Sequence, residues 1–218
     1  MSILKLDNLT YSYDGNKNNI LKGINYEFEK GKIYAIVGKS GEGKTTTLSL
    51  LSGLTSPTEG HIYYDGKDLE RIDKYKYRST MVGVIFQGYN LLPQLTADEN
   101  VILSLDLSGK KIKNKKEVAR QALLSVELDD EKAKRRILKL SGGEQQRVAI
   151  ARTLCYEPDI IFADEPTGNL DNDTGDGIMN IFKKLAREDN KCVIVVTHSE
   201  KVASFADKVI TLKNGLLV

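Results

Sequence analysis

The nine residues from Gly38 to Thr46 constrain the fold of this chain more than any other stretch of its sequence. An apolar, strand-like run at residues 33–37 precedes them, and a helix-forming segment at residues 48–51, closed by Gly53, follows them. This order of strand, glycine-rich loop and helix is the setting of a P-loop in an α/β protein. The loop matches the pattern G-x-x-x-x-G-K-[ST] at four fixed positions, Gly38, Gly43, Lys44 and Thr45.

The residue types of this loop suit the binding of phosphate. Glycines let successive backbone N–H groups turn toward phosphate oxygens, and the following helix directs its positive N-terminus at the same anion. Lys44 supplies a mobile positive charge for the terminal phosphates, and the Thr45 hydroxyl can reach a magnesium ion. A glycine-rich turn before an ordinary helix is the simpler alternative, but four fixed positions in the right setting disfavour it. We expect the phosphates to contact residues 38–46, namely Gly38, Ser40, Gly41, Gly43, Lys44, Thr45 and Thr46.

Length, charge and cysteine content narrow the class of protein. A chain of 218 residues can bury the core of one domain, with or without an inserted subdomain. A net charge of +2 gives no argument for nucleic-acid binding. Cys155 and Cys192 lie far apart without a metal-ligand spacing, which favours reduced thiols in the cytosol. No apolar run approaches the roughly 18 residues of a membrane span, and no signal-peptide core is present, so we expect a cytoplasmic protein that needs a partner for any membrane role.

The N-terminal residues predict β-strands. Residues 3–13 alternate as a strand does, residues 20–28 form a second strand, and residues 14–16 between them form a turn. Tyr13 stands just ahead of that turn. Its ring is placed either to meet a purine or to lie half-buried in the strand, and the residues favour neither reading.

A later stretch predicts a short strand that carries a histidine. Residues 61–64 lie between a turn at residues 57–60 and a tight turn at Asp65-Gly66. We expect His61 to be a surface strand residue and not a metal ligand, since no acid or second histidine is spaced to join it.

Polar residues follow three buried, strand-like runs. Gln87, Asp164, Glu165 and His198 each come at or just after the end of such a run. In α/β folds, ligands bind at the carboxyl ends of the strands. In a P-loop protein, Asp164 is then expected to hold the magnesium shell and Glu165 to polarise a water, the alternative being one structural acid that caps the next turn. Gln87 is suited to coordinate a cation, to orient a water or to cap a loop.

Residues 88–157 are predicted to be mainly helical. Residues 96–99 form a capping box that opens a helix. Five lysines lie between residues 109 and 116, and such a run favours a solvated loop over a nucleic-acid patch. One face of a further helix is marked by Val118, Ala122 and Val126.

Residues 140–147, Leu-Ser-Gly-Gly-Glu-Gln-Gln-Arg, carry a second signal for phosphate binding. Ser141 and Glu144 form a capping box that begins a helix. An exposed Ser-Gly-Gly at a helix N-terminus is also a second anion site, yet the chain holds no second P-loop to use it. Two half-sites in one chain suggest that two chains complete each other.

Together these residues resemble the nucleotide-binding subunit of ATP-binding-cassette (ABC) transporters, over essentially the whole chain. The decisive stretch is residues 140–145, because this signature distinguishes the family from other P-loop ATPases. The resemblance implies an α/β fold: a P-loop NTPase (RecA-like) core with an N-terminal antiparallel β subdomain and an inserted α-helical subdomain. It implies one ABC ATPase domain, residues 1–218, with residues 1–87 and 158–218 as the core and residues 88–157 as the helical subdomain.

The resemblance also assigns roles, with ATP and Mg²⁺ as the cofactors. Tyr13 would stack on adenine, Glu165 would be the general base, and His198 the switch histidine. Gln87 would contact magnesium and sense the membrane partner, alongside Thr45 and Asp164 as magnesium ligands. At the dimer interface, Asp171 would be the D-loop acid, and the γ-phosphate bound to the opposite subunit would be contacted by Ser141 and Gly143.

The implied partners are a second copy of the chain, in an ATP-sandwich dimer, and an integral membrane permease on a separate chain that holds it at the inner face of the cell membrane. Residues 164–171, with residues 86–87 and 92–93, are similar to one branch of the family. That branch includes ATPases of macrolide exporters, lipoprotein-releasing complexes, bacitracin-type peptide exporters and the cell-division pair. An exporter or mechanotransmission complex is therefore expected.

Three alternatives are a cell-division ATPase without transport, an ABC-type ATPase acting on DNA or ribosomes, and a scaffold that only binds ATP. The segment between P-loop and signature holds no sustained heptads, and the chain has a single cassette, which disfavours a nucleic-acid partner. Intact Glu165 and His198 disfavour the scaffold.

Two departures from the family pattern stand out. Glu42 occupies a P-loop position where the family usually has a small residue. A carboxylate so near phosphates is unfavourable unless it points to solvent. Residues 132–139 also lack the proline common before the signature.

Overall fold

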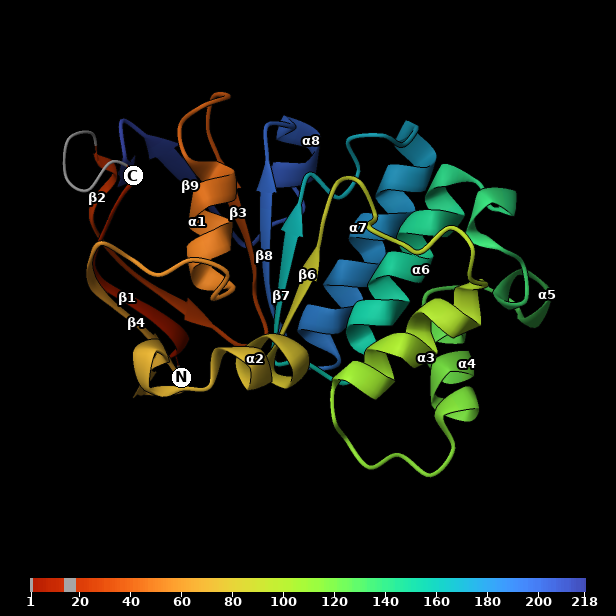
Figure 1. Ribbon diagram of the computed structural model, residues 1–218. Coiled ribbons are helices and arrows are strands. Elements are labelled where there is room, and N and C mark those ends of the chain that lie inside the picture. Colours follow the sequence, from red (N-terminus) through yellow and green to blue (C-terminus); the bar gives the residue numbers. More distant parts are fainter. Residues whose placement is uncertain (1, 14–18) are drawn as a thin grey trace.

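The computed structural model describes residues 2–13 and 19–218, which form two β-sheets flanked by helices (Figure 1). The strands are β1 (Ser2–Ser12), β2 (Asn19–Glu29), β3 (Ile33–Val37), β4 (Glu59–Tyr64), β5 (Lys67–Asp68), β6 (Val82–Ile85), β7 (Ile160–Asp164), β8 (Cys192–Thr197), β9 (Lys208–Lys213) and β10 (Leu216–Leu217). The helices are α1 (Lys44–Leu51), α2 (Lys74–Lys76), α3 (Ala97–Leu107), α4 (Lys115–Ser125), α5 (Asp130–Ala133), α6 (Gly142–Leu154), α7 (Asn172–Arg187) and α8 (Glu200–Ala203). Short helical turns lie at Leu69–Arg71, Tyr77–Met81 and Ile137–Lys139.

The smaller sheet is antiparallel, in the order β2-β1-β4-β5. Its central strand β1 buries Leu4 and Leu6, because alternate residues of a strand face the same side, and it buries Leu9 after a shift of register between Leu6 and Leu9. The two N-terminal strands and the antiparallel sheet are thus confirmed. The predicted turn at residues 14–16 lies outside the described residues.

The larger sheet has the order β10-β9-β3-β8-β7-β6, and its strands from β9 to β6 run parallel. Val37 at the end of β3 pairs with Thr197 of β8, and Asp164 of β7 pairs with Val196. Since the carboxyl ends of parallel strands meet at one edge, this register brings the predicted polar strand ends to the same side as the P-loop.

Helices cover both faces of the larger sheet, and this explains why its strands are apolar on both sides. Figure 1 shows α1 on one face and α7 and α6 on the other. Leu48 of α1 belongs to the same core as Ile36 and the antiparallel sheet, whereas Ile178 and Phe182 of α7 belong to the second core, on the opposite face.

The helices α3 to α6 are inserted between β6 and β7. The capping box that opens α3 is confirmed, with Thr96 and Glu99 bonded reciprocally. The predicted face of α4 packs against the helical core: Val126 is fully buried, and Val118 and Ala122 are half-buried at its flank. The centre of the buried stripe is formed by Ala119 and Leu123.

Two expectations about the segment before β5 need correction. The turn at residues 57–60 is shorter than predicted, because β4 begins at Glu59, which pairs with Thr10 of β1. His61 is an exposed strand residue, as expected, but an acid does join it. Its Nδ1 lies 2.9 Å from Oδ2 of Asp68, since the β4–β5 hairpin brings the two together.

Ligand atoms of His61, Asp68 and Glu70 lie within 4.8 Å of one another. The Asp68 carboxylate also accepts the Glu70 backbone N–H at 2.9 Å, so it caps the turn that follows β5. We interpret this group as the closure of a hairpin.

Both cysteines are free thiols, as predicted, and both are buried. Burial raises the pKa of Cys155 and of Cys192 to about 12, so neither is a reactive thiolate near neutral pH. None of the helices in the described ranges combines the length and apolarity needed to cross a bilayer.

Candidate functional site

A cavity of about 680 Å³ opens at the carboxyl edge of the larger sheet. It brings together most of the residues that the sequence places in the site, although they come from five separate parts of the chain. The described residues that line it are Tyr13, Ile20, Gly38, Lys39, Ser40, Gly41, Gly43, Lys44, Thr45, Thr46, Gln87, Asp164, Glu165 and His198.

The P-loop joins β3 to α1 in a conformation that its glycines make possible. Gly41 and Gly43 have φ values of 86° and 97°, a region that side chains disfavour. The Lys44 ammonium donates to the carbonyl oxygens of Gly38 and Lys39 at 2.8 and 3.0 Å. Its charge therefore lies over the loop, within the cavity that a polyphosphate would enter.

Hard oxygen donors gather beside the first turn of α1. The Thr45 hydroxyl donates to Oδ2 of Asp164 at 3.2 Å. Burial raises the pKa of the Asp164 carboxyl, the Thr45 hydrogen bond opposes that rise, and the nearby Glu165 charge adds to it. A divalent cation would relieve the cost of this buried charge, so Thr45 and Asp164 fit a magnesium ion, and the Gln87 amide lines the same cavity.

Glu165 is held from three directions just beyond the end of β7. The Thr197 hydroxyl donates to its Oε2 at 2.9 Å, and the His198 backbone N–H donates to its Oε1 at 2.9 Å. The His198 ring brings Nδ1 to 2.6 Å from the same Oε1. Glu165 itself has a φ of 44°, and its N–H is bonded to the Val196 carbonyl. This carboxylate is oriented before any substrate arrives.

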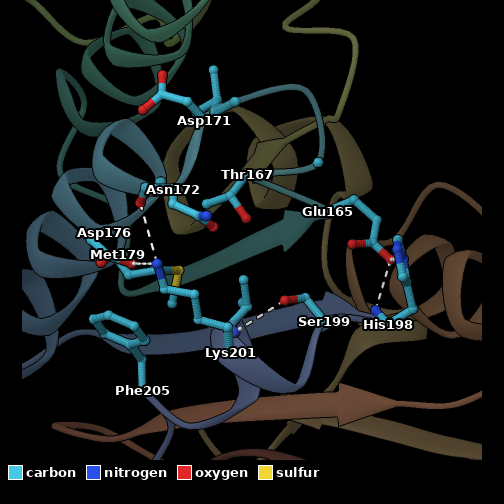
Figure 2. Close-up of a pocket in the computed structure, with 14 residues that line it drawn as sticks. Glu165, Thr167, Asp171, Asn172, Asp176, Met179, His198, Ser199, Lys201 and Phe205 are labelled. Carbon is cyan, nitrogen blue, oxygen red and sulfur yellow. Dashed lines mark hydrogen bonds and ion pairs between the residues drawn. The ribbon is translucent and has the colours of Figure 1, made fainter.

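Glu165 and His198 also border a second, smaller cavity of about 220 Å³ (Figure 2). Its other walls come from the loop after β7, the start of α7 and the region of α8. Across it, Lys201 forms an ion pair with Asp176 at 2.7 Å. The Glu165 carboxylate therefore stands between the P-loop cavity and this one.

The exposure of Tyr13 decides whether its ring is buried in the strand. Its side chain is 68% exposed, and its hydroxyl lies 3.1 Å from the Thr46 hydroxyl. It is therefore not half-buried in the strand. Its ring contacts the Tyr11 ring edge-on, with the centroids 5.1 Å apart, and lies exposed at the rim of the cavity, where a planar base could meet it.

Gln87 follows β6 and is packed against the loop after β7. Asn169 donates to the Gln87 carbonyl at 3.3 Å, and a Cβ on Gly168 would come within 3.0 Å of the Gln87 side-chain nitrogen. The amide thus lies between the P-loop cavity and the loop after β7.

The signature residues lie elsewhere. Ser141 caps α6 in the expected box with Glu144, and a Cβ on Gly143 would meet Thr174 at 2.4 Å. Asp171 caps α7, and the hydrogen bond from Thr174 lowers its pKa. Neither Ser141, Gly143 nor Asp171 lines the P-loop cavity; Asp171 lines the smaller one.

Three contacting residues were not singled out by the sequence. Thr197 orients Glu165, Asn169 holds Gln87, and Thr174 fixes Asp171. The signal available for Thr197 was a polar residue that ends a buried strand directly before His198.

The arrangement suits a nucleoside triphosphate in the P-loop cavity, with the Glu165 carboxylate in the cavity wall. A family model for ABC transporters matches residues 21–168. The chain is 46% identical over 215 residues to the uncharacterized ABC transporter ATP-binding protein YclH of Bacillus subtilis, covering 99% of this chain and 95% of that protein. It is 40% identical to the lipoprotein-releasing system ATP-binding protein LolD of Aquifex aeolicus, covering 99% and 96%.

Solved structures agree. A dimeric structure of MJ0796, from Methanocaldococcus jannaschii, superposes with a TM-score of 0.89 at 41% identity, covering 98% of this chain and 96% of that one. A post-hydrolysis structure of MJ0796 bound to ADP and Pi gives 0.88 at 40% identity with the same coverage. This chain belongs to the ABC transporter ATP-binding family. It is an ABC ATPase, and both the cassette fold and the resemblance to the lipoprotein-releasing branch are confirmed.

Proposed function

We propose that two copies of this chain bind Mg²⁺-ATP between them, and that hydrolysis drives a membrane permease on a separate chain. One observation carries the proposal. The P-loop cavity contains the base and the cation ligands, whereas the second anion-binding loop of the same chain lies outside it. The missing wall is supplied if a second copy places its signature loop over the cavity.

ATP occupies the P-loop cavity with its base on the Tyr13 ring and its phosphates along residues 38–46. The Lys44 ammonium exchanges the Gly38 and Lys39 carbonyls for phosphate oxygens. Thr45, Asp164 and Gln87 hold Mg²⁺, which when bound screens the phosphate charge.

Hydrolysis follows from the fixed position of Glu165. The carboxylate takes a proton from a water while the oxygen of that water bonds to the γ-phosphorus. The bond between the γ-phosphorus and the β–γ bridging oxygen breaks, and ADP and phosphate are formed. Thr197 and His198 keep the carboxylate aimed at that water. Ser141 and Gly143 of the second copy contact the γ-phosphate, and Asp171 lies at the interface.

The helical segment at residues 88–157 transmits closure of the dimer to the permease, which places the chain at the inner face of the cell membrane. The resemblance to LolD favours an exporter or a mechanotransmission complex, for lipoproteins, peptides or drugs. Cell-division regulation without transport is the second candidate in the same branch.

A nucleic-acid partner is not proposed. Within the lysine run, the Lys110 ammonium donates to the Tyr156 carbonyl, and Lys115 pairs with Asp106. Two of the five lysines thus serve contacts within the fold.

The experiment that tests the proposal is the oligomeric state of Glu165→Gln with ATP. We expect this variant to bind ATP, to lose at least about a hundredfold in turnover, and to accumulate as an ATP-bound dimer in gel filtration with light scattering. Lys44→Ala serves as the control. It is expected to stay monomeric, because it lacks the ammonium group that pairs with the phosphates and therefore does not bind ATP. A Glu165→Gln protein that remains monomeric with saturating ATP and hydrolyses at the wild-type rate would refute the assignment.

A further inference from the structure

Glu42 is the one residue of segment 38–46 that does not line the P-loop cavity. Its carboxylate is turned away, and Oε2 accepts a hydrogen bond from the Asn214 backbone N–H at 2.7 Å. A negative charge facing bound phosphates would repel them. In this orientation the charge is neither directed at the phosphates nor left in open solvent, because a backbone N–H donor satisfies it.

The donating N–H, that of Asn214, belongs to the turn between β9 and β10. Asn214 and Gly215 have φ values of 50° and 82°, as a two-residue hairpin turn requires. The Gly215 carbonyl accepts the Lys22 N–H at 2.9 Å, and a Cβ on Gly215 would come within 2.6 Å of the Ile20 carbonyl oxygen. The turn is therefore fixed against β2, so it offers Glu42 a rigid donor.

The P-loop also touches this hairpin and β2 through its glycines. A Cβ on Gly38 would lie 2.6 Å from the Leu212 carbonyl of β9, and one on Gly43 would lie 2.6 Å from Ile20 Cγ2. Ile20 in turn lines the cavity together with Tyr13. The hairpin, β2 and the P-loop thus contact one another around the cavity. Within this group, the Glu42 side chain accepts a hydrogen bond from the hairpin and so links the P-loop to it.

We propose that Glu42 is a positioning residue that clamps the P-loop to the C-terminal hairpin and so preorganises the loop for phosphate. The inference rests on the proposed P-loop site. A loop with glycines at positions 38, 41 and 43 has much backbone freedom, and freedom present before binding is lost on binding. The clamp removes part of that freedom in advance, which raises the affinity for ATP.

The test is a titration of the full chain with a fluorescent ATP analogue, comparing wild type, Glu42→Ala, Glu42→Gln and Lys44→Ala. Glu42→Ala is expected to weaken binding about tenfold, the effect of one charge-assisted hydrogen bond. Glu42→Gln is expected to stay within about threefold of wild type, because its amide oxygen still accepts from Asn214. Glu188→Ala, at the exposed C-cap of α7, is the matched control and should leave binding unchanged.

A local readout separates the clamp from a general loss of fold. Amide hydrogen exchange of the peptide that contains Asn214 should be faster in Glu42→Ala and near wild type in Glu42→Gln. Binding by Glu42→Ala as tight as wild type, or Glu42→Gln as weak as Glu42→Ala, overturns the clamp. Lys44→Ala separates the proposed ATP site from the proposed clamp. If Lys44→Ala binds the analogue like wild type, the assignment of the ATP site to the P-loop is wrong. If Lys44→Ala is the one variant that loses binding, the site holds and only the role of Glu42 as a clamp is wrong.

Discussion

At the scale of single residues, the position of Glu165, the proposed general base, depends on a threonine that the sequence does not single out. Thr197 is fully buried at the end of β8, where its hydroxyl donates to Oε2 of Glu165 and accepts the Ser199 N–H at 3.1 Å. The carboxylate is thereby anchored through one oxygen, while His198 contacts the other. Thr197 acts through Glu165, so it is a positioning residue.

Thr197→Val keeps the shape of the side chain and removes its hydroxyl. We expect kcat for ATP hydrolysis to fall roughly tenfold with little change in KM, because the orientation of the base affects the transition state more than ATP binding. Thr197→Ser keeps the hydroxyl and should retain most of the activity. Steady-state kinetics on both variants provide the measurement, and an unchanged kcat in Thr197→Val would show that His198 alone orients Glu165.

The residues of the P-loop cavity were predictable because phosphate chemistry fixes both their types and their spacing. Thr197 and Thr174 were not, since their roles arise from contacts that only the fold creates. Thr197 reaches Glu165 because β7 and β8 pair with Asp164 opposite Val196. The exposure of Tyr13 is not encoded locally for a related reason: the alternation of a strand does not tell whether a ring at its end is buried or exposed.

At the scale of elements, the contact between β6 and α6 connects two parts of the proposed site. β6 leads to Gln87, and α6 begins at the signature. A Cβ on Gly83 of β6 would come within 2.1 Å of Thr153 Cγ2 on α6. The strand and the helix therefore approach each other more closely than any side chain at position 83 allows.

Gly83→Ala is expected to lower the free energy of unfolding by about 2 kcal/mol, because the added methyl overpacks this contact. Thr153→Ser removes the Cγ2 methyl group that a side chain at position 83 would meet, and it keeps the hydroxyl that donates to the Ala149 carbonyl. The double variant should therefore recover part of the loss. Denaturant unfolding of the two single variants and the double variant measures this, and a Gly83→Ala protein as stable as wild type would contradict the tight approach.

Elements with strong local signals were predictable, and those made by distant pairing were not. The capping boxes at Thr96 and Ser141 each depend on two residues three positions apart in the sequence, and both are confirmed. The approach of Asp68 to His61 depends on the short β5 strand, which the sequence does not mark. The order of the larger sheet likewise arises from contacts between distant segments.

At the scale of the whole molecule, one chain carries the P-loop and the signature loop, which we propose to bind phosphate as well, and the two do not meet. The P-loop precedes α1 on one face of the larger sheet, whereas the signature begins α6 on the other (Figure 1). The division into a core and a helical subdomain at residues 88–157 stays a prediction, and so does the sharing of each ATP between two chains. Both claims concern how the parts move and associate, which local sequence signals do not encode.

The rate of ATP hydrolysis as a function of protein concentration, with Mg²⁺ present, tests that sharing most directly. Wild type and Glu165→Gln are measured side by side. If two chains complete each site, the wild-type rate rises faster than linearly with concentration until the dimer is saturated, and the variant shows almost no turnover. A strictly linear rate that survives in Glu165→Gln would mean a self-contained site with a different base, and would contradict the account.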